Sequence, residues 1–343
     1  MKQGILRRTF IASGAAAVAM PAILRNGHAQ SQNTVVLAMP NAGLLNTPLF
    51  TATAMGIFKK HGIEPKYEYF KGGVAATAAL VGGSAHITPE SASSTIKAKL
   101  NGAGVQVVGG LVTQYAANVV AKPELLNGRN PKDIPVVERI KLLKGRKLAV
   151  TGAGSGTHQM AVFLCKKAGL NPDTDLTISF LGTGDAMVAA LQQGSIDAAI
   201  VASPSLERAQ QTSGAVLLVV PQIGEIEEIN PFLYVSLNAA SKWLEGNQEV
   251  GTRFMKAVAE AMAYLKSGNT DEGRDLVQKA FFPKLDEDLY RRAWDFMNHA
   301  FARTPKITND DVAKVLWFVE VAANEKLDVK PSAVYNDVLV RSL

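Results

Sequence analysis

The fold of this chain is decided by KLAVTGAGSGTHQMAVFLCKKAG (residues 147–169), which is followed by LTISF (176–180), GTGD (182–185) and IDAAIV (196–201). The short apolar runs predict β-strands, the glycine-rich segments predict tight turns, and the runs that end at glycine predict helices. Strands that alternate with helices of this length are typical of parallel βαβ units, so we expect an α/β fold.

An earlier part of the chain repeats this design. FKKHGI (58–63) matches CKKAGL (165–170), AALVGGS (78–84) matches AALQQGS (189–195), and FKGG (70–73) precedes a predicted helix as FLGTG (180–184) does. The matches keep the same order and lie roughly 107–111 residues apart, which is far longer than the repeat of a solenoid. The pattern therefore predicts two α/β lobes of similar design.

The predicted elements also indicate how the chain passes between the lobes. We interpret residues 118–122 as a crossover into the second lobe and the extended run FLYVSL (232–237) as the return. Helices are predicted after the return, at residues 252–265, 271–281, 286–301 and 309–324. We therefore expect lobe one to comprise residues 30–122 and 231–343, and lobe two to comprise residues 123–230. The C-terminal helical block should pack on lobe one.

Composition limits the classes of function. The chain has 343 residues, of which 47% are hydrophobic and 19% charged, as in an ordinary globular protein. Its formal net charge is +6, but residues 1–29 hold four basic residues and no acidic one, which leaves 32 basic against 30 acidic residues in the remainder. A nearly neutral body gives no support for nucleic-acid binding. We expect a monomer without a nucleic-acid partner.

Residues 1–29 have the features of an export signal. Lys2, Arg7 and Arg8 form a basic start, residues 10–24 are mostly apolar and small, and small residues lead to a cleavage site near Ala29. The arginine pair resembles a twin-arginine signal, although the usual Ser or Thr before the pair is absent. The sequence therefore predicts a periplasmic protein and leaves the export route open between Sec and Tat.

Signals for catalysis are poor. The single cysteine, Cys165, excludes an internal disulfide and a cysteine-based metal cluster, and its apolar surroundings predict a buried thiol. The histidines show no zinc-protease spacing, and the chain contains neither a GxSxG elbow nor a GxxxxGK[ST] phosphate loop. GAGSG (152–156) is only a partial dinucleotide fingerprint. We therefore expect no catalytic residues, no metal, no cofactor and no enzyme activity.

Open α/β sheets bind ligands at the carboxyl ends of their strands. Six loops are expected at these ends and should face one another across a cleft between the lobes: residues 40–47, 71–73, 89–93, 152–158, 181–185 and 202–205. Ser155 and Thr157 either help to bind an anion at the start of a helix or only cap that helix. Glu90 and Asp185 are open in the same way between a ligand contact and a cap, and the role of His158 also stays open.

Several motifs together resemble a known family. They are GIFKKHGI (56–63), the glycine pair 72–73 followed by ALVGGS (79–84), LLKGRKLAV (142–150) and ALQQGSIDA (190–198). In this order they resemble the periplasmic solute-binding proteins of ABC importers, in particular the nitrate/sulfonate/bicarbonate and thiamine-precursor-like group. One departure is His86, because the family usually has Asp at this position.

The resemblance implies a two-lobed periplasmic-binding-protein-like fold of type II, with two chain crossovers, that closes on a small molecule and presents it to an ABC permease in the inner membrane. The glycine- and hydroxyl-rich turns favour a carboxylate or sulfonate on a small organic body, and the lack of an obvious cleft arginine disfavours a strongly anionic ligand such as nitrate. From their places at strand ends and crossovers, we expect ligand contacts from Asn41, Asn46, Thr47, Gly73, Ser91, Gln114, Ser155, Thr157, Asp185, Ser203 and Tyr234.

Two alternatives remain. The first is an enzyme on the same fold, similar to the pyridoxal-phosphate-dependent thiamine-pyrimidine synthases, although the export signal argues against a cytosolic cofactor. The second is a ligand-binding subunit that docks to a membrane sensor.

Overall fold

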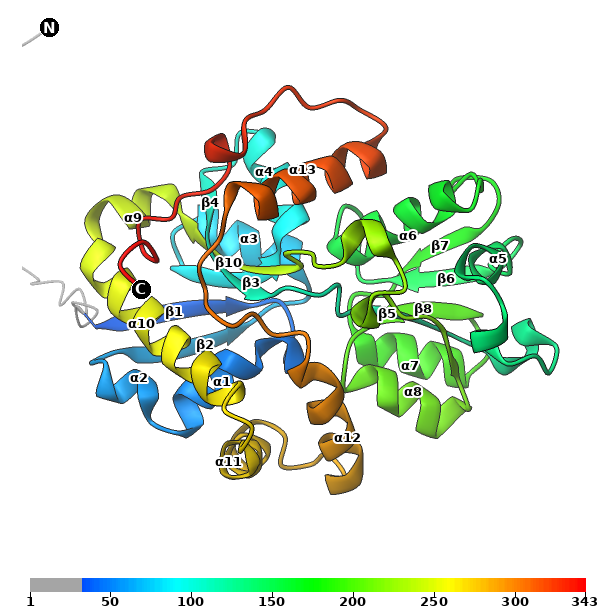
Figure 1. Cartoon of the computed structure of the whole chain (residues 1–343), viewed down its shortest axis with the longest axis horizontal. Helices are drawn as coiled ribbons and strands as arrows, with labels where there is room; N and C mark the ends of the chain where they lie inside the picture. The colour runs from blue at the N-terminus through cyan, green and yellow to red at the C-terminus, as the bar shows by residue number, and fades with distance from the viewer. Residues whose placement is uncertain (1–32) are drawn as a thin grey trace, which may run out of the picture. The chain divides into compact units, whose positions relative to one another are not determined.

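The structure is a computed structural model that describes residues 33–343, so the predicted export signal lies outside the described residues. Its two five-stranded sheets define the two lobes (Figure 1). The strands of lobe one are, across the sheet, β2 (Glu64–Tyr69), β1 (Thr34–Met39), β3 (Ile87–Ser91), β10 (Val235–Ala240) and β4 (Val105–Val112). Those of lobe two are β7 (Thr177–Phe180), β6 (Lys147–Val150), β8 (Ala198–Val201), β5 (Asn118–Ala121) and β9 (Val216–Val219).

The two sheets have the same design, as the repeated motifs predict. In each lobe the first strand of the repeat pairs in parallel with the second and the third, which is the expected βαβ arrangement. In each lobe an antiparallel strand lies between the third and the fourth: β10 in lobe one and β5 in lobe two. Both antiparallel strands belong to segments interpreted from the sequence as crossovers. The chain thus enters the second sheet before residue 122, where we expected the boundary.

Helices cover these sheets. Lobe one has α1 (Thr47–Ala54), α2 (Ile57–Lys60), α3 (Gly73–Val81) and α4 (Ala92–Leu100), and lobe two has α5 (Val136–Lys141), α6 (Gly156–Lys167), α7 (Gly184–Gln192) and α8 (Ser205–Ser213). The sequence predicts one helix over residues 49–60, but Gly56 adopts a left-handed conformation with φ of 71° and separates α1 from α2. Such a backbone is readily adopted only by glycine.

The C-terminal block contains α9 (Ser241–Gly246), α10 (Gln248–Leu265), α11 (Asp271–Phe281), α12 (Glu287–Asn298) and α13 (Asn309–Ala323). Helices α10 and α11 pack on α1 of lobe one, as expected. The later helices touch both lobes: α12 contacts the 3₁₀ turn Leu44–Asn46 and α8, while α13 contacts α4 and α6 (Figure 1). The block therefore packs on lobe one and also reaches lobe two.

The segments that cross between the sheets are residues 113–117, between β4 and β5, and residues 220–234, between β9 and β10, rather than residues 118–122 and 232–237 as expected. These two crossovers lie beside one another. The backbone N–H groups of Phe232 and Tyr234 donate to the carbonyls of Thr113 and Val112. Tyr115 is fully buried between these strands, with its ring 4.1 Å from that of Tyr234. Its hydroxyl donates to the carbonyl of Gly156, at the start of α6, over 2.7 Å. The link between the lobes is therefore a paired, aromatic-filled segment.

Candidate functional site

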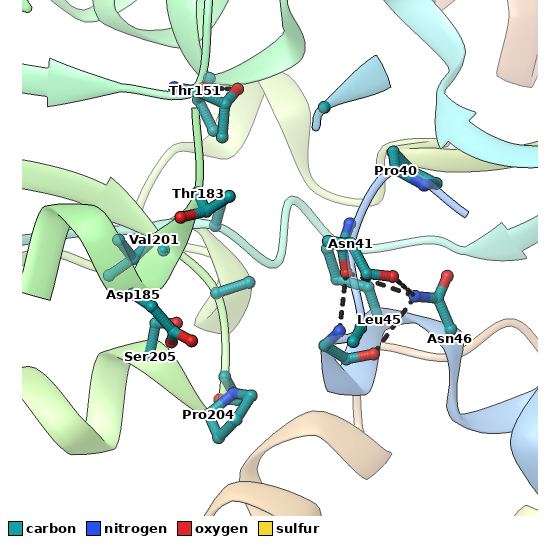
Figure 2. Close-up of a pocket in the computed structure, with 18 of the residues that line it drawn as sticks. Pro40, Asn41, Leu45, Asn46, Thr151, Thr183, Asp185, Val201, Pro204 and Ser205 are labelled. Atoms are coloured by element: carbon teal, nitrogen blue, oxygen red, sulfur yellow. Dashed lines mark hydrogen bonds between the residues drawn. The ribbon is translucent and has the colours of Figure 1, made fainter. Parts of the chain in front are cut away.

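A cavity of about 600 Å³ lies between the carboxyl ends of the two sheets. This is within the usual size range of a small-molecule pocket. Each of the six loops expected at the strand ends contributes lining residues. Figure 2 shows residues of lobe one, such as Asn41 and Leu45, on one side of the cavity, with Thr183, Asp185 and Ser205 of lobe two on the other.

The structure brings most of the candidate ligand contacts to this cavity. The lining includes Asn41, Asn46, Gly73, Ser91, Ser155, Thr157, Asp185, Ser203 and Tyr234. Thr47 and Gln114 are not among the lining residues. The Thr47 hydroxyl is buried and donates to the carbonyl of Leu44 over 2.7 Å, because it lies at the start of α1 and turns back onto the preceding 3₁₀ turn. Gln114 lies in the first crossover.

The loop before α1 is held by its two asparagines. The Asn46 side-chain amide donates to the backbone carbonyl of Asn41 over 3.1 Å and lies 3.3 Å from both the Asn41 side-chain oxygen and the Gly43 carbonyl (Figure 2). The Asn41 oxygen also accepts from the Gly43 N–H over 2.9 Å. Asn46 is almost fully buried. The donors of Asn46 are thus used to shape this wall.

On lobe two, the first turn of α6 is built from hydroxyl groups. Ser155 is the N-cap, and its side chain accepts from the His158 N–H over 3.2 Å. The Thr157 hydroxyl accepts from the Thr151 N–H over 3.0 Å and lies 2.8 Å from the Thr151 hydroxyl. His158 instead accepts from the Gly154 N–H at Nδ1, which holds the turn, and burial lowers its pKa. The helix-capping role is therefore present at Ser155.

The neighbouring wall of lobe two carries an ion pair. Asp185 lies in the first turn of α7, and its carboxylate is 2.5 Å from a guanidinium nitrogen of Arg208 on α8. Both side chains line the cavity, and that of Asp185 is 73% exposed. The expectation of a cleft without an obvious arginine is therefore wrong. Arg208 is not among the expected residues, because no helix is predicted from the sequence over the polar run SLERAQQTS (205–213).

On lobe one, Glu90 is the next-to-last residue of β3 and lines the cavity while remaining only 8% exposed. Its carboxylate lies directly over Gly73, where a Cβ atom would come within 2.0 Å of a carboxylate oxygen. Burial raises the pKa of Glu90 to about 7, and a hydrogen bond from the Ser91 backbone opposes this shift. Burial raises the pKa of the nearby hydroxyls of Tyr115 and Tyr234, and the negative charge of Glu90 adds to this rise. Gly73 is needed here for close approach.

Aromatic side chains complete the cavity. Tyr69 is the last residue of β2 and Phe70 follows it, while Phe281 is the last residue of α11 and Phe282 follows it. Tyr69 is 52% exposed, which is high for a large hydrophobic residue. None of these four residues is predicted from the sequence. A Phe-Phe-Pro sequence at the end of a predicted helix was the available signal for the second pair.

His86, the departure from the family pattern, lies away from the cavity lining. Its Nδ1 accepts from the Val36 N–H over 3.2 Å, and its ring stacks on Trp243 with centroids 5.3 Å apart. Its contacts are therefore those of a packing residue. Across residues 33–343, no group of three or more His, Cys, Asp or Glu side chains is placed to hold a metal ion. No helix in that same range is both long and apolar enough to span a membrane.

Comparison with protein families matches residues 30–280 to the NMT1-like family. No curated protein sequence matches. Among solved structures, a protein of Bordetella bronchiseptica RB50 is similar over 90% of this chain and 96% of its own, with 24% identity and a TM-score of 0.75.

Two other structures carry informative names. The periplasmic nitrate-binding protein NrtA of Synechocystis PCC 6803 has 15% identity and a TM-score of 0.72, over 90% of this chain and 88% of its own. The periplasmic aliphatic sulphonate binding protein SsuA of Escherichia coli has 18% identity and a TM-score of 0.68, over 89% and 92%. At these identities the likeness shows the fold, which is the two-lobed periplasmic-binding-protein-like fold expected from the sequence.

Proposed function

This chain belongs to the NMT1-like family, and we propose that it is an extracytoplasmic solute-binding protein that captures a small organic ligand between its lobes and delivers it to an ABC permease. The observation that carries the proposal is the cavity of about 600 Å³, which is shared by the strand ends of two sheets of the same design. The export features of residues 1–29 support a periplasmic location. We propose no enzyme activity and a monomeric protein.

The crossovers supply the hinge that such a function needs. They are hydrogen-bonded to one another, so both can bend together, and the lobes otherwise meet through contacts that can separate. The Leu44 N–H of lobe one donates to the Ser203 carbonyl of lobe two, and the Ser94 hydroxyl donates to the Gly154 carbonyl. A ligand that touches both walls would favour this arrangement by its differential affinity for it.

For the ligand we propose a carboxylate or a sulfonate on a small organic body. Helices α6 and α7 both begin at the lobe-two wall, where their free N–H groups favour an anion. Arg208 adds a cation at the same wall. Because Asp185 already pairs with this guanidinium, the wall suits one weakly held acidic group better than a small inorganic anion alone.

The test is a thermal-shift screen of the mature protein against small carboxylates and sulfonates. A ligand at 100 times its dissociation constant adds about 2.7 kcal/mol to the folded state, which should raise the melting temperature by several degrees. Two variants locate the site. Arg208→Gln should weaken binding of the best hit about tenfold, and Asp185→Asn should strengthen it because the guanidinium becomes free.

The opposite signs of these two effects are the control, since a general loss of folding would weaken binding in both variants. Lys326→Gln, at an exposed position outside the cavity lining, should leave the affinity unchanged. If neither Arg208→Gln nor Asp185→Asn changes the affinity of the best hit, its acidic group binds elsewhere in the protein. Silence across the acids would count against the proposed ligand class.

A further inference from the structure

Glu90 is a buried carboxylate without a counter-ion in the described chain. It is 8% exposed, and no Lys, Arg or His among residues 33–343 forms an ion pair with it. Within residues 33–343, the hydrogen bond that stabilises its charge comes from the Ser91 backbone. A carboxylate withdrawn from water is costly unless it is paired. The lobe-one wall of the cavity therefore carries a buried carboxylate whose negative charge is not compensated by any cation of the described chain.

The described neighbours of Glu90 do not supply this positive charge. Helix α3, which lies beneath the carboxylate, contains no ionisable side chain. Tyr234, just before β10, and Tyr115, in the first crossover, present only hydroxyl groups. The other charged groups that line the cavity are Asp185 and Arg208, which are paired with each other, and the exposed Lys284. The open side of Glu90 is the cavity itself.

The fold also fixes the position of this carboxylate. Glu90 belongs to β3, an inner strand that is paired with β1 and with β10. Its side chain fills the space over Gly73 that any larger residue would occupy. A flexible surface acid could turn toward water, but this group is held at the wall of the cavity.

From this geometry we propose that Glu90 binds a positively charged nitrogen of the ligand, so that the solute is dipolar: an amine or amidine faces lobe one while an acidic group faces lobe two. The inference rests on the proposed function and narrows its ligand class to amino carboxylates and amino sulfonates. The aromatic side chains of Tyr69, Phe70 and Phe281 would cover the apolar body between the two charged ends.

The experiment compares probes that differ only in the nitrogen. 3-Aminopropanesulfonate is paired with butanesulfonate, and 4-(aminomethyl)benzoate with 4-ethylbenzoate, because an ammonium and a methyl group have similar size. Calorimetric titration of the wild-type protein at pH 8 should show an advantage of at least about tenfold for the amine in the pair that fits the cavity. In Glu90→Gln this advantage should disappear, while the affinity for the methyl analogue is kept or increased.

A pH series gives a second readout. Protons compete with the amine for Glu90, so the affinity of the amine should fall by up to about tenfold per pH unit as the pH is lowered below 7. The Glu90→Gln variant should show no such slope. Gly73→Ala, which leaves the charge but displaces the carboxylate, should also reduce the amine advantage. Gly152→Ala, where a Cβ meets nothing within 4 Å, is the matched control.

The outcomes separate the two proposals. If the acids bind but their amine partners bind no better, or if the amine advantage survives in Glu90→Gln, the inference about Glu90 is overturned and the solute-binding function stands. If none of the four probes and no member of the acid screen binds, both proposals are contradicted.

Discussion

Glu90 links the ionisation of a single side chain to the stability of the whole protein. Burial raises its pKa from 4.5 to about 7, so the folded state binds a proton more tightly than the unfolded chain does. For an acid with a raised pKa, stability is greatest below the unfolded pKa and falls as the pH rises toward the folded one. The affected window therefore runs from about pH 4.5 to pH 7.

Replacing Glu90 by Gln should remove this dependence. We expect the free energy of unfolding of the variant to exceed that of the wild type at pH 8 by up to about 3 kcal/mol, since each pKa unit corresponds to about 1.4 kcal/mol. At pH 4 the two proteins should be similar. Denaturant unfolding of the ligand-free proteins at both pH values measures this. Equal stability at pH 8 would show that the folded protein does not oppose the charge.

At the scale of elements, α13 connects the two lobes. It begins with a capping box, in which Thr308 and Asp311 satisfy each other's backbone N–H groups. Its last turn is held from lobe two, because the Lys166 ammonium donates to the Val321 carbonyl over 2.7 Å. A cation is favourable at the C-terminus of a helix. Any opening of the cavity must therefore release or carry α13.

We expect Lys166→Met to loosen the end of α13 without unfolding the protein. Amide hydrogen exchange should become faster for residues 321–325 and stay unchanged in α10, which packs on lobe one. The loss of stability should be about 1 kcal/mol, because the lost hydrogen bond is charge-assisted but only partly buried. Unchanged exchange at the end of α13 would mean that this contact does not restrain the helix.

The helices and strands also show how much of the fold could be predicted from the sequence. The sequence shows a glycine at position 56, but it does not show that this glycine adopts a left-handed backbone conformation. That conformation divides one predicted helix into α1 and α2. Strand β5 has only four residues and lies in a segment interpreted as a crossover, because its partners β8 and β9 are distant in sequence. The parallel strands were predictable since their motifs repeat. The antiparallel strands depend on pairing that no local pattern contains.

The same limit applies to the site. The six loops could be placed because strand ends meet at one edge of a sheet, and nine candidate residues do line the cavity. The ion pair of Asp185 with Arg208 was not predictable, since it joins α7 to a helix that was not foreseen. The sequence also does not indicate in which direction a side chain points. Thr47, for example, does not line the cavity, because its hydroxyl bonds to the carbonyl of Leu44 in its own loop.

At the scale of the whole molecule, the two lobes approach each other tightly at Gly156. A Cβ atom on this residue would come within 2.6 Å of the Ser91 hydroxyl oxygen and 2.8 Å of its Cβ, across the boundary between the lobes. Real Cβ atoms do not tolerate such contacts. Gly156 therefore permits the lobes to meet as they do.

Gly156→Ala should push the lobes apart. We expect the affinity for any ligand that bridges the walls to fall by about 1–3 kcal/mol, the usual cost of overpacking, with a larger radius of gyration by small-angle scattering. Gly152→Ala, in the same turn but with open space around it, is the control. If Gly156→Ala binds as tightly as the wild type, the lobe contact at Ser91 contributes nothing to closure.

The position of β10 has a consequence for how the chain is made. All strands of lobe two lie between residues 118 and 219, so this lobe can complete its sheet as soon as that segment has left the ribosome. Lobe one begins first, but its sheet needs residues 235–240 between β3 and β4. During synthesis the sheet of lobe one therefore stays incomplete, without β10, until lobe two has been translated. A chain that is to be exported unfolded would gain time from that delay.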